Sequence, residues 1–121
     1  MTKALSIMQP WAHLVVAGVK RIENRTWTTD YRGLVLIHAS STYAREARRD
    51  LRRMNVSVPD ILPRGCLIGF AELVDVVCES SDPFFTGPFG FVLRNAQALR
   101  RPVPMAGRLR LFEIGQLQLS A

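Results

Sequence analysis

The stretch PWAHLVVAGVKRIENRTW, residues 10–27, changes its pattern half-way and so predicts the first two elements of the fold. Its first half is apolar with helical spacing, because Trp11, Leu14 and Val15 fall on one face at i, i+3 and i+4. Gly18 stands where a helix commonly ends, since glycine takes the left-handed conformation readily. We therefore expect a short amphipathic helix that ends at Gly18.

The second half of the stretch is dense in charge and alternates from Lys20 onward, which is typical of a strand. One face of this strand carries Arg21, Glu23, Arg25 and Trp27. Lys20 opens the strand, so its own orientation is less constrained. These charges form either a solvated strand face or the polar end of a pocket, and the alternation by itself leaves both open.

Strand and turn signals fill most of the remaining chain. A second helix is expected over residues 42–54, capped by Ser40 or Ser41. Strands are expected over residues 1–8, 34–40, 65–77 with a bend at Gly69, 89–93 and 108–114, with an extended segment over 100–107. The later strands follow one another too closely for βαβ crossovers. We expect an α+β fold, namely a small, mostly antiparallel β-barrel of about five to six strands with two or three helices packed around a cleft, in one domain over residues 1–121.

The composition favours a folded, basic protein. Hydrophobic residues make up 48% of the 121, which is enough for a core, and no apolar run approaches the ~20 residues of a membrane span. The net charge of +6 raises the expectation of a polyanionic partner. Of the 16 Lys and Arg residues, all but Lys3 and Lys20 are Arg, whose guanidinium suits phosphate and stacks on bases. Genome composition would produce the same bias toward Arg.

The two cysteines, Cys66 and Cys78, stand in apolar surroundings without metal-ligand spacing, so we expect buried free thiols. The first residues make a poor secretory signal, and a cytoplasmic location is expected by default. The sequence contains no cofactor motif, metal-ligand cluster or phosphate-cradling glycine loop, so neither a cofactor nor a metal is expected.

Residues 9–40, QPWAHLVVAGVKRIENRTWTTDYRGLVLIHAS, resemble the ASCH domains, a branch of the PUA-like superfamily. The family pattern Gly-x-Lys-x-x-Glu-x-Arg is met by Gly18, Lys20, Glu23 and Arg25. Matching residues surround it: Gln9-Pro10-Trp11, Trp27, Tyr31-Arg32-Gly33 and His38-Ala39-Ser40. The later segments IGFAELVDVV, GPFGFVL and RRPVPMAGRLRLFEI are also similar, so the likeness covers nearly the whole chain. It implies a PUA-like β-barrel whose helix-lined cleft receives RNA or a nucleobase.

Members of this family differ in activity. Some bind nucleic acid, some bacterial members cleave RNA, and one branch hydrolyses the acetyl amide of N4-acetylcytidine with a Lys, a Thr and a Glu. In that branch a Thr takes the place of Glu23, which counts against that activity here. Ribonuclease chemistry stays open, with Lys20 or Glu23 as the base and Arg25 and Arg32 stabilising the phosphorane. Arg110 is a further departure, since the resemblance implies a small Gly there.

Within the expected cleft, Lys20 would contact a phosphate or polarise a carbonyl, and Glu23 would accept a hydrogen bond from a base edge. Arg25 would hold a phosphate. Trp11 and Trp27 are candidates to stack a base, at ~1–3 kcal/mol per base, although the position of Trp11 on the apolar helical face favours core packing.

Further candidates lie around this group. Gln9 is included from the family pattern, and Tyr31 and Arg32 stand in a turn where a ligand can reach them. His38 ends a buried strand, where a hydrogen-bonded core histidine is the commoner outcome. On the second helix, Arg48 and Arg52 either track a nucleic-acid backbone or belong to a solvated face.

Three hypotheses follow. The first is a module that binds RNA, single-stranded nucleic acid or a modified nucleoside. The alternative is an RNA-directed hydrolase that uses Lys20 and Glu23, and the third is a protein-interaction domain.

Overall fold

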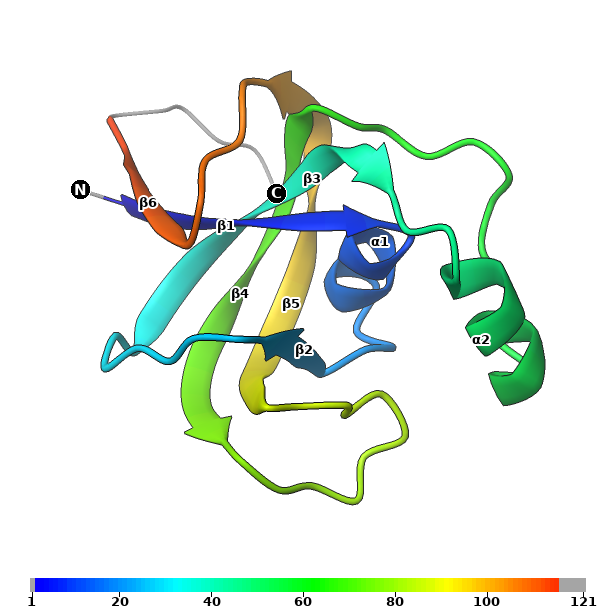
Figure 1. Ribbon diagram of the computed structural model, residues 1–121. Coiled ribbons are helices and arrows are strands. Elements are labelled where there is room, and N and C mark those ends of the chain that lie inside the picture. The colour runs from blue at the N-terminus through cyan, green and yellow to red at the C-terminus, as the bar shows by residue number, and fades with distance from the viewer. Residues whose placement is uncertain (1, 116–121) are drawn as a thin grey trace.

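The computed structural model describes residues 2–115, which form one six-stranded, mostly antiparallel sheet with two helices (Figure 1). The helices are α1 (Trp11–Val16) and α2 (Ala47–Met54). The strands are β1 (Thr2–Gln9), β2 (Ile22–Arg25), β3 (Gly33–Tyr43), β4 (Cys66–Val77), β5 (Phe89–Pro104) and β6 (Leu111–Ile114). The predicted α+β class is confirmed.

The sheet has the strand order β2-β5-β4-β3-β1-β6, and only β1 and β3 are parallel neighbours. β6 pairs only with the first half of β1, from Thr2 to Leu5. Just beyond that half, the Arg25 side chain of β2 donates a hydrogen bond to the Ser6 carbonyl at 2.6 Å. β2, at one end of the sheet, therefore lies close to β1 near the other end. Within residues 2–115 the Arg25 side chain makes this contact, because β1 and β2 are not paired through their backbones. The fold is barrel-like, as predicted.

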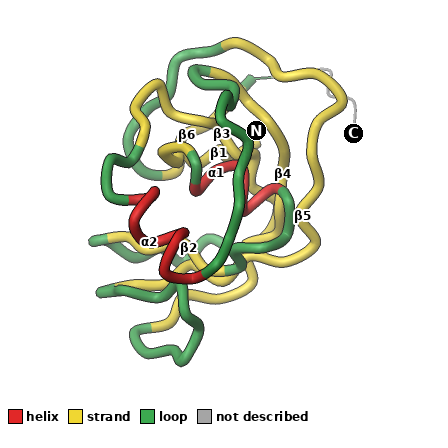
Figure 2. The backbone as a smooth tube through the Cα atoms, turned by 90° about the vertical axis from the view of Figure 1, so that its right-hand side faces the viewer, coloured by secondary structure: helices red, strands yellow, loops and turns green. Residues whose placement is uncertain are grey.

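Helix α1 fills the inside of this curved sheet. It packs against β1, β3, β4 and β5, and Figure 2 shows it within the ring of strands. Leu14 and Val15 are buried, as the helical spacing predicts. Gly69 of β4 permits the contact, because a Cβ there would lie 2.7 Å from the Val16 methyl groups. The pairing of β4 with β3 and β5 is irregular beside Gly69, which agrees with the predicted bend.

Several predicted boundaries are wrong, and the largest difference is at β5, which continues to Pro104 where a strand over residues 89–93 was expected. Helix α2 begins at Ala47 rather than residue 42, since β3 continues to Tyr43, which pairs with Gln9. Ser40 and Ser41 are consequently strand residues, and Glu46 occupies the N-cap position. The last strand begins at Leu111 rather than residue 108, because residues 108–110 belong to the loop between β5 and β6.

The cysteines differ in their surroundings. Both thiols are free, as predicted, and Cys66 is buried at the start of β4, where burial raises its pKa. Cys78 is exposed, so the prediction of a buried thiol is wrong for it. It follows the last residue of β4 and stands where the chain leaves the sheet, beyond the apolar positions of the strand.

Candidate functional site

The turn that ends α1 positions Lys20 in the candidate site. Gly18 has φ 78°, and its N–H donates to the Val15 carbonyl at 3.0 Å while the Val19 N–H donates to the Leu14 carbonyl at 3.0 Å. This is a Schellman motif, and it confirms the predicted helix end. The Lys20 N–H also donates to the Leu14 carbonyl at 3.0 Å. The motif reverses the chain and directs it into β2.

Lys20, Glu23 and Arg25 form a charged cluster. Lys20 Nζ donates to Glu23 Oε1 at 2.6 Å and to the Ile22 carbonyl at 2.5 Å. The second Glu23 oxygen lies 3.2 Å from Arg25 Nη2. Lys20 is 3% exposed and Glu23 8% exposed, so these charges tolerate burial only because they are paired and hydrogen-bonded. The alternation in the sequence allows either a solvated strand face or the polar end of a pocket. The burial of Lys20 and Glu23 excludes a solvated face for these two residues.

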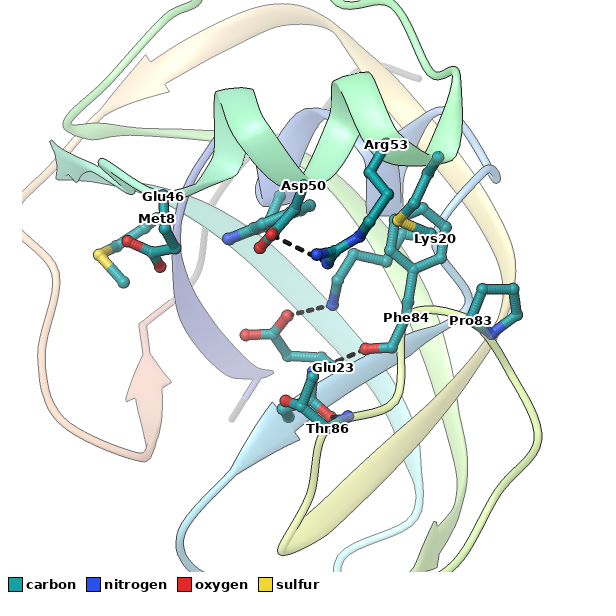
Figure 3. Close-up of a pocket in the computed structure, with 12 residues that line it drawn as sticks. Met8, Lys20, Glu23, Glu46, Asp50, Arg53, Pro83, Phe84 and Thr86 are labelled. Atoms are coloured by element: carbon teal, nitrogen blue, oxygen red, sulfur yellow. Dashed lines mark hydrogen bonds and ion pairs between the residues drawn. The ribbon is translucent and has the colours of Figure 1, made fainter.

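A cavity of about 380 Å³, called here the Lys20 cavity, opens over this cluster. Figure 3 shows Lys20 and Glu23 joined on one side and the Asp50–Arg53 pair of α2 on the other. An ammonium group has three N–H donors, and described residues occupy two of those on Lys20. The cavity is lined by Met8, Trp11, Lys20, Glu23, Asn24, Glu46, Asp50, Arg53, Met54, Pro83, Phe84 and Thr86.

Two aromatic rings form an apolar wall of the Lys20 cavity. Trp11 and Phe84 meet edge to face, with ring centroids 6.3 Å apart and planes at 79°. Lys20 Nζ lies 5.9 Å from the Trp11 ring centroid and 6.0 Å from that of Phe84, within range of cation–π attraction. Trp11 is half-buried and packs against the core while it also lines the cavity, so the expectation that it belongs to the core describes only half of its role.

Asn24 is a site residue that the sequence did not single out. Its Nδ2 donates to the Phe84 carbonyl at 2.8 Å, and its Oδ1 accepts from the N–H groups of Thr86 at 2.8 Å and Gly87 at 3.1 Å. It thereby ties the loop between β4 and β5 to β2 and places Phe84 at the cavity. The sequence signal is indirect, because Pro83, Gly87 and Pro88 indicate only that a loop precedes β5.

A second hollow of about 510 Å³, called here the arginine pocket, adjoins the Lys20 cavity. The two share the residues Met8, Trp11, Glu23 and Asn24. Trp27 and Phe91 meet edge to face, with ring centroids 5.0 Å apart, and the Arg110 guanidinium lies 5.4 Å from the Trp27 ring centroid. The pocket is lined by Ser6, Met8, Trp11, Glu23, Asn24, Arg25, Thr26, Trp27, Ser40, Arg108, Leu109 and Arg110.

Five predicted residues lie outside both hollows, and three of them, Gln9, Tyr31 and Arg32, instead form hydrogen bonds with the backbone. Gln9 is fully buried, where its amide donates to the Pro63 carbonyl at 2.8 Å and accepts from the His13 N–H at 2.9 Å. Tyr31 donates to the Leu34 carbonyl at 2.7 Å, and Arg32 donates to the carbonyls of its own turn. These side chains stabilise the backbone around the site and do not face the Lys20 cavity.

The arginines of α2 line two different hollows. Arg53 lines the Lys20 cavity and pairs with Asp50 at 3.1 Å. Arg48 and Arg52, the two candidates from the sequence, are exposed and line a separate hollow of about 320 Å³ that also contains Asp60. The sequence did not distinguish Arg53 from its neighbours, because helical spacing alone does not say which face meets a cavity.

His38 is a hydrogen-bonded core residue, as predicted. It is 1% exposed, its Nε2 donates to the Met105 carbonyl at 2.6 Å, and its Nδ1 lies 3.0 Å from the Ser6 hydroxyl. Within residues 2–115, His, Cys, Asp and Glu nowhere gather in threes as metal ligands would. The helices of this same part of the chain include none long and apolar enough to cross a bilayer.

A family model for the ASCH domain matches residues 5–85. The chain belongs to the ASCH family. It is 32% identical to human Activating signal cointegrator 1 and 31% identical to the mouse protein, over 128 aligned residues in each case. These alignments cover 91% of this chain but 22% of the relatives, so the chain spans about a fifth of their length. The crystal structure of ASCH from Zymomonas mobilis shares the fold, with a TM-score of 0.54 at 20% identity, over 85% of this chain and 73% of that one.

Proposed function

We propose that this ASCH domain binds single-stranded RNA, or another ligand that contains a nucleobase, with the base in the Lys20 cavity. The observation that carries the proposal is a buried, paired Lys20 and Glu23 facing a cavity of about 380 Å³ with an aromatic wall. Small-molecule sites combine aromatic side chains with placed polar groups that fix the orientation of the ligand, and this cavity has both. The proposed unit is one cytoplasmic domain over residues 1–121.

The donor and acceptor in the cavity select among bases. Lys20 has an N–H to donate, and Glu23 Oε1, 2.6 Å away, has a lone pair to accept with. Cytosine and adenine present an acceptor nitrogen beside an amino group on the edge that single strands expose, which matches this arrangement. Uracil and guanine present the reverse order, so a uracil or guanine in the same pose would place donor against donor and acceptor against acceptor. We therefore expect cytosine or adenine in the cavity, packed against Trp11 and Phe84.

Binding is favoured over hydrolysis by the state of Glu23. Both of its oxygens already accept from cations, Oε1 from Lys20 and Oε2 from Arg25, and the proposed role uses the lone pair left on Oε1 for the amino group of the base rather than for an attacking water or a 2′-hydroxyl. The protein-interaction hypothesis does not account for two buried charges around a cavity. Incubation of the protein with labelled RNA, followed by a denaturing gel, tests the hydrolase directly, and intact RNA is the expected result.

The binding test is a fluorescence-anisotropy titration of labelled ten-residue RNAs, one of cytosines and one of uracils. Wild type is expected to prefer the cytosine strand, and Lys20→Gln is expected to weaken that complex about tenfold, as the loss of one charged hydrogen bond does. Arg100→Gln, an exposed change on β5 outside both hollows, is the control for charge. Equal affinity of wild type and Lys20→Gln for the cytosine strand would contradict the proposal.

A further inference from the structure

The two adjoining hollows differ in charge. The Lys20 cavity contains Lys20 and Arg53 together with the acids Glu23, Glu46 and Asp50, so cations do not outnumber anions there. The arginine pocket contains Arg25, Arg108 and Arg110 against Glu23 alone. A neutral, planar group suits the first hollow, and an anion suits the second. Because the hollows share a wall, one ligand can occupy both.

The guanidinium groups of the arginine pocket retain unused donors. Arg25 Nη2 is committed to the Ser6 carbonyl and to Glu23, but its Nε is buried without a hydrogen-bond partner within residues 2–115. Arg108 and Arg110 form no ion pair with another described residue, whereas Arg53 is paired with Asp50. A buried donor that lacks a partner is unfavourable, and a phosphate oxygen would satisfy it.

Arg110 stands in a backbone conformation that favours glycine. Its φ is 58°, which explains physically why the family resemblance implies a Gly at this position. A side chain in this region persists when the surroundings hold it, and such residues gather at functional sites. Here the strained residue brings a guanidinium over the Trp27 ring at the edge of the pocket.

The loop that carries Arg108 and Arg110 is fixed to the barrel. His38 Nε2 holds the Met105 carbonyl at 2.6 Å. Gly107 packs so closely that a Cβ would lie 2.8 Å from both the His38 ring and the Ser6 hydroxyl. The two arginines therefore follow an anchored segment, which reduces the entropy lost when they close on an anion.

We propose that the arginine pocket is a phosphate subsite, which holds the phosphodiester next to the base seated in the Lys20 cavity. The inference rests on the proposed function and sharpens it: the ligand is a strand rather than a free nucleoside. Guanidinium groups bind phosphate through paired N–H donors, and Arg25, Arg108 and Arg110 surround the place where that phosphate would lie.

The test is competition against the labelled cytosine strand by four compounds: cytidine, cytidine 5′-monophosphate, the dinucleoside monophosphate CpC and inorganic phosphate. For wild type, CpC is expected to compete about tenfold better than cytidine, as one charged hydrogen bond to phosphate provides. Arg108→Gln with Arg110→Gln is expected to abolish this advantage and to leave the competition by cytidine within about twofold. The slope of log K against log salt for the labelled strand should become shallower by about 0.7, because the double variant neutralises one phosphate fewer.

The matched control is Arg100→Gln with Arg101→Gln, which removes the same charge from an exposed part of β5 outside both hollows. Equal effects of the two double variants, or an equal loss of cytidine and CpC, would overturn the phosphate subsite while the base site stands. If cytidine 5′-monophosphate competes as well as CpC, the proposed preference for a strand over a single nucleotide is overturned. Failure of wild type to bind the labelled strand would overturn the proposed function itself. Thermal unfolding confirms beforehand that each variant folds.

Discussion

The charged cluster and the outer face of α2 carry the same kind of side chain in opposite settings. In the cluster, Lys20 is 3% exposed and every neighbouring charge is paired. On the outer face, Arg48 and Arg52 are exposed, and neither forms an ion pair with another described residue. A buried charged side chain is held by a few fixed partners, and the loss of one partner is strongly destabilising. An exposed charged side chain is screened by salt and can change its conformation freely. The first setting suits recognition of a base and the second suits attraction of a backbone.

The largest expected effect is on folding stability. Lys20→Ala leaves Glu23 buried with Arg25 alone and should lower the free energy of unfolding by about 3 kcal/mol. Arg48→Gln with Arg52→Gln should change it by less than about 0.5 kcal/mol, since exposed substitutions seldom do more. Urea denaturation measures both. Similar values for the two variants would remove the distinction between the two regions.

The next effect separates base contact from backbone attraction. Trp11→Leu removes an aromatic wall of the Lys20 cavity and should weaken binding of the cytosine strand about tenfold, with the salt dependence unchanged. Arg48→Gln with Arg52→Gln should instead lower the salt slope by about 0.7 for each phosphate that is no longer neutralised, with the preference for cytosine unchanged. Anisotropy titrations at several salt concentrations distinguish these results. A steep loss of base preference in the helix variant would contradict the assignment.

The two thiols extend the comparison between buried and exposed groups to chemical reactivity. Burial raises the pKa of Cys66, so less of it is the reactive thiolate at a given pH, while Cys78 is exposed. Ellman's reagent under mildly alkaline conditions should modify Cys78 rapidly in the folded protein and Cys66 only after denaturation. Cys78→Ser should abolish the fast phase. Rapid modification in that variant would show that β4 opens at its first residue.

The smallest effect concerns an exposed ion pair. Lys3 of β1 donates to Glu113 of β6 at 2.8 Å, and this hydrogen bond lowers the pKa of that carboxyl below its ordinary value. The contribution of the pair is therefore present above the ordinary pKa of Glu113 and is lost as the pH falls through the lowered value. Glu113→Gln should reduce the melting temperature slightly at neutral pH and should not change it in strong acid, where the carboxyl is protonated. A difference that persists in acid would mean that the glutamine disturbs strand pairing instead.

Some features of this protein follow from local pattern alone. The helical spacing from Trp11, the glycine at residue 18 and the alternation after it predict α1, its Schellman end and the charged strand. They do so because each depends on neighbours within one or two turns of chain. The end of β3 and the beginning of α2 were predicted wrongly, since pairing of Tyr43 with Gln9 extends the strand at the expense of the helix.

Local sequence was sufficient to predict the α+β class, α1 with its end at Gly18, and the close spacing of Lys20, Glu23 and Arg25. The folded chain was needed to show that Lys20 and Glu23 are buried, and that Asn24, Arg53 and Phe84 meet them in one cavity. It was needed equally to show that Arg108 and Arg110, rather than Arg32 or Arg48, stand beside Arg25. The reason is that side-chain periodicity encodes which face of an element is apolar, whereas the curvature of the sheet and the anchoring of its loops decide which distant segments converge.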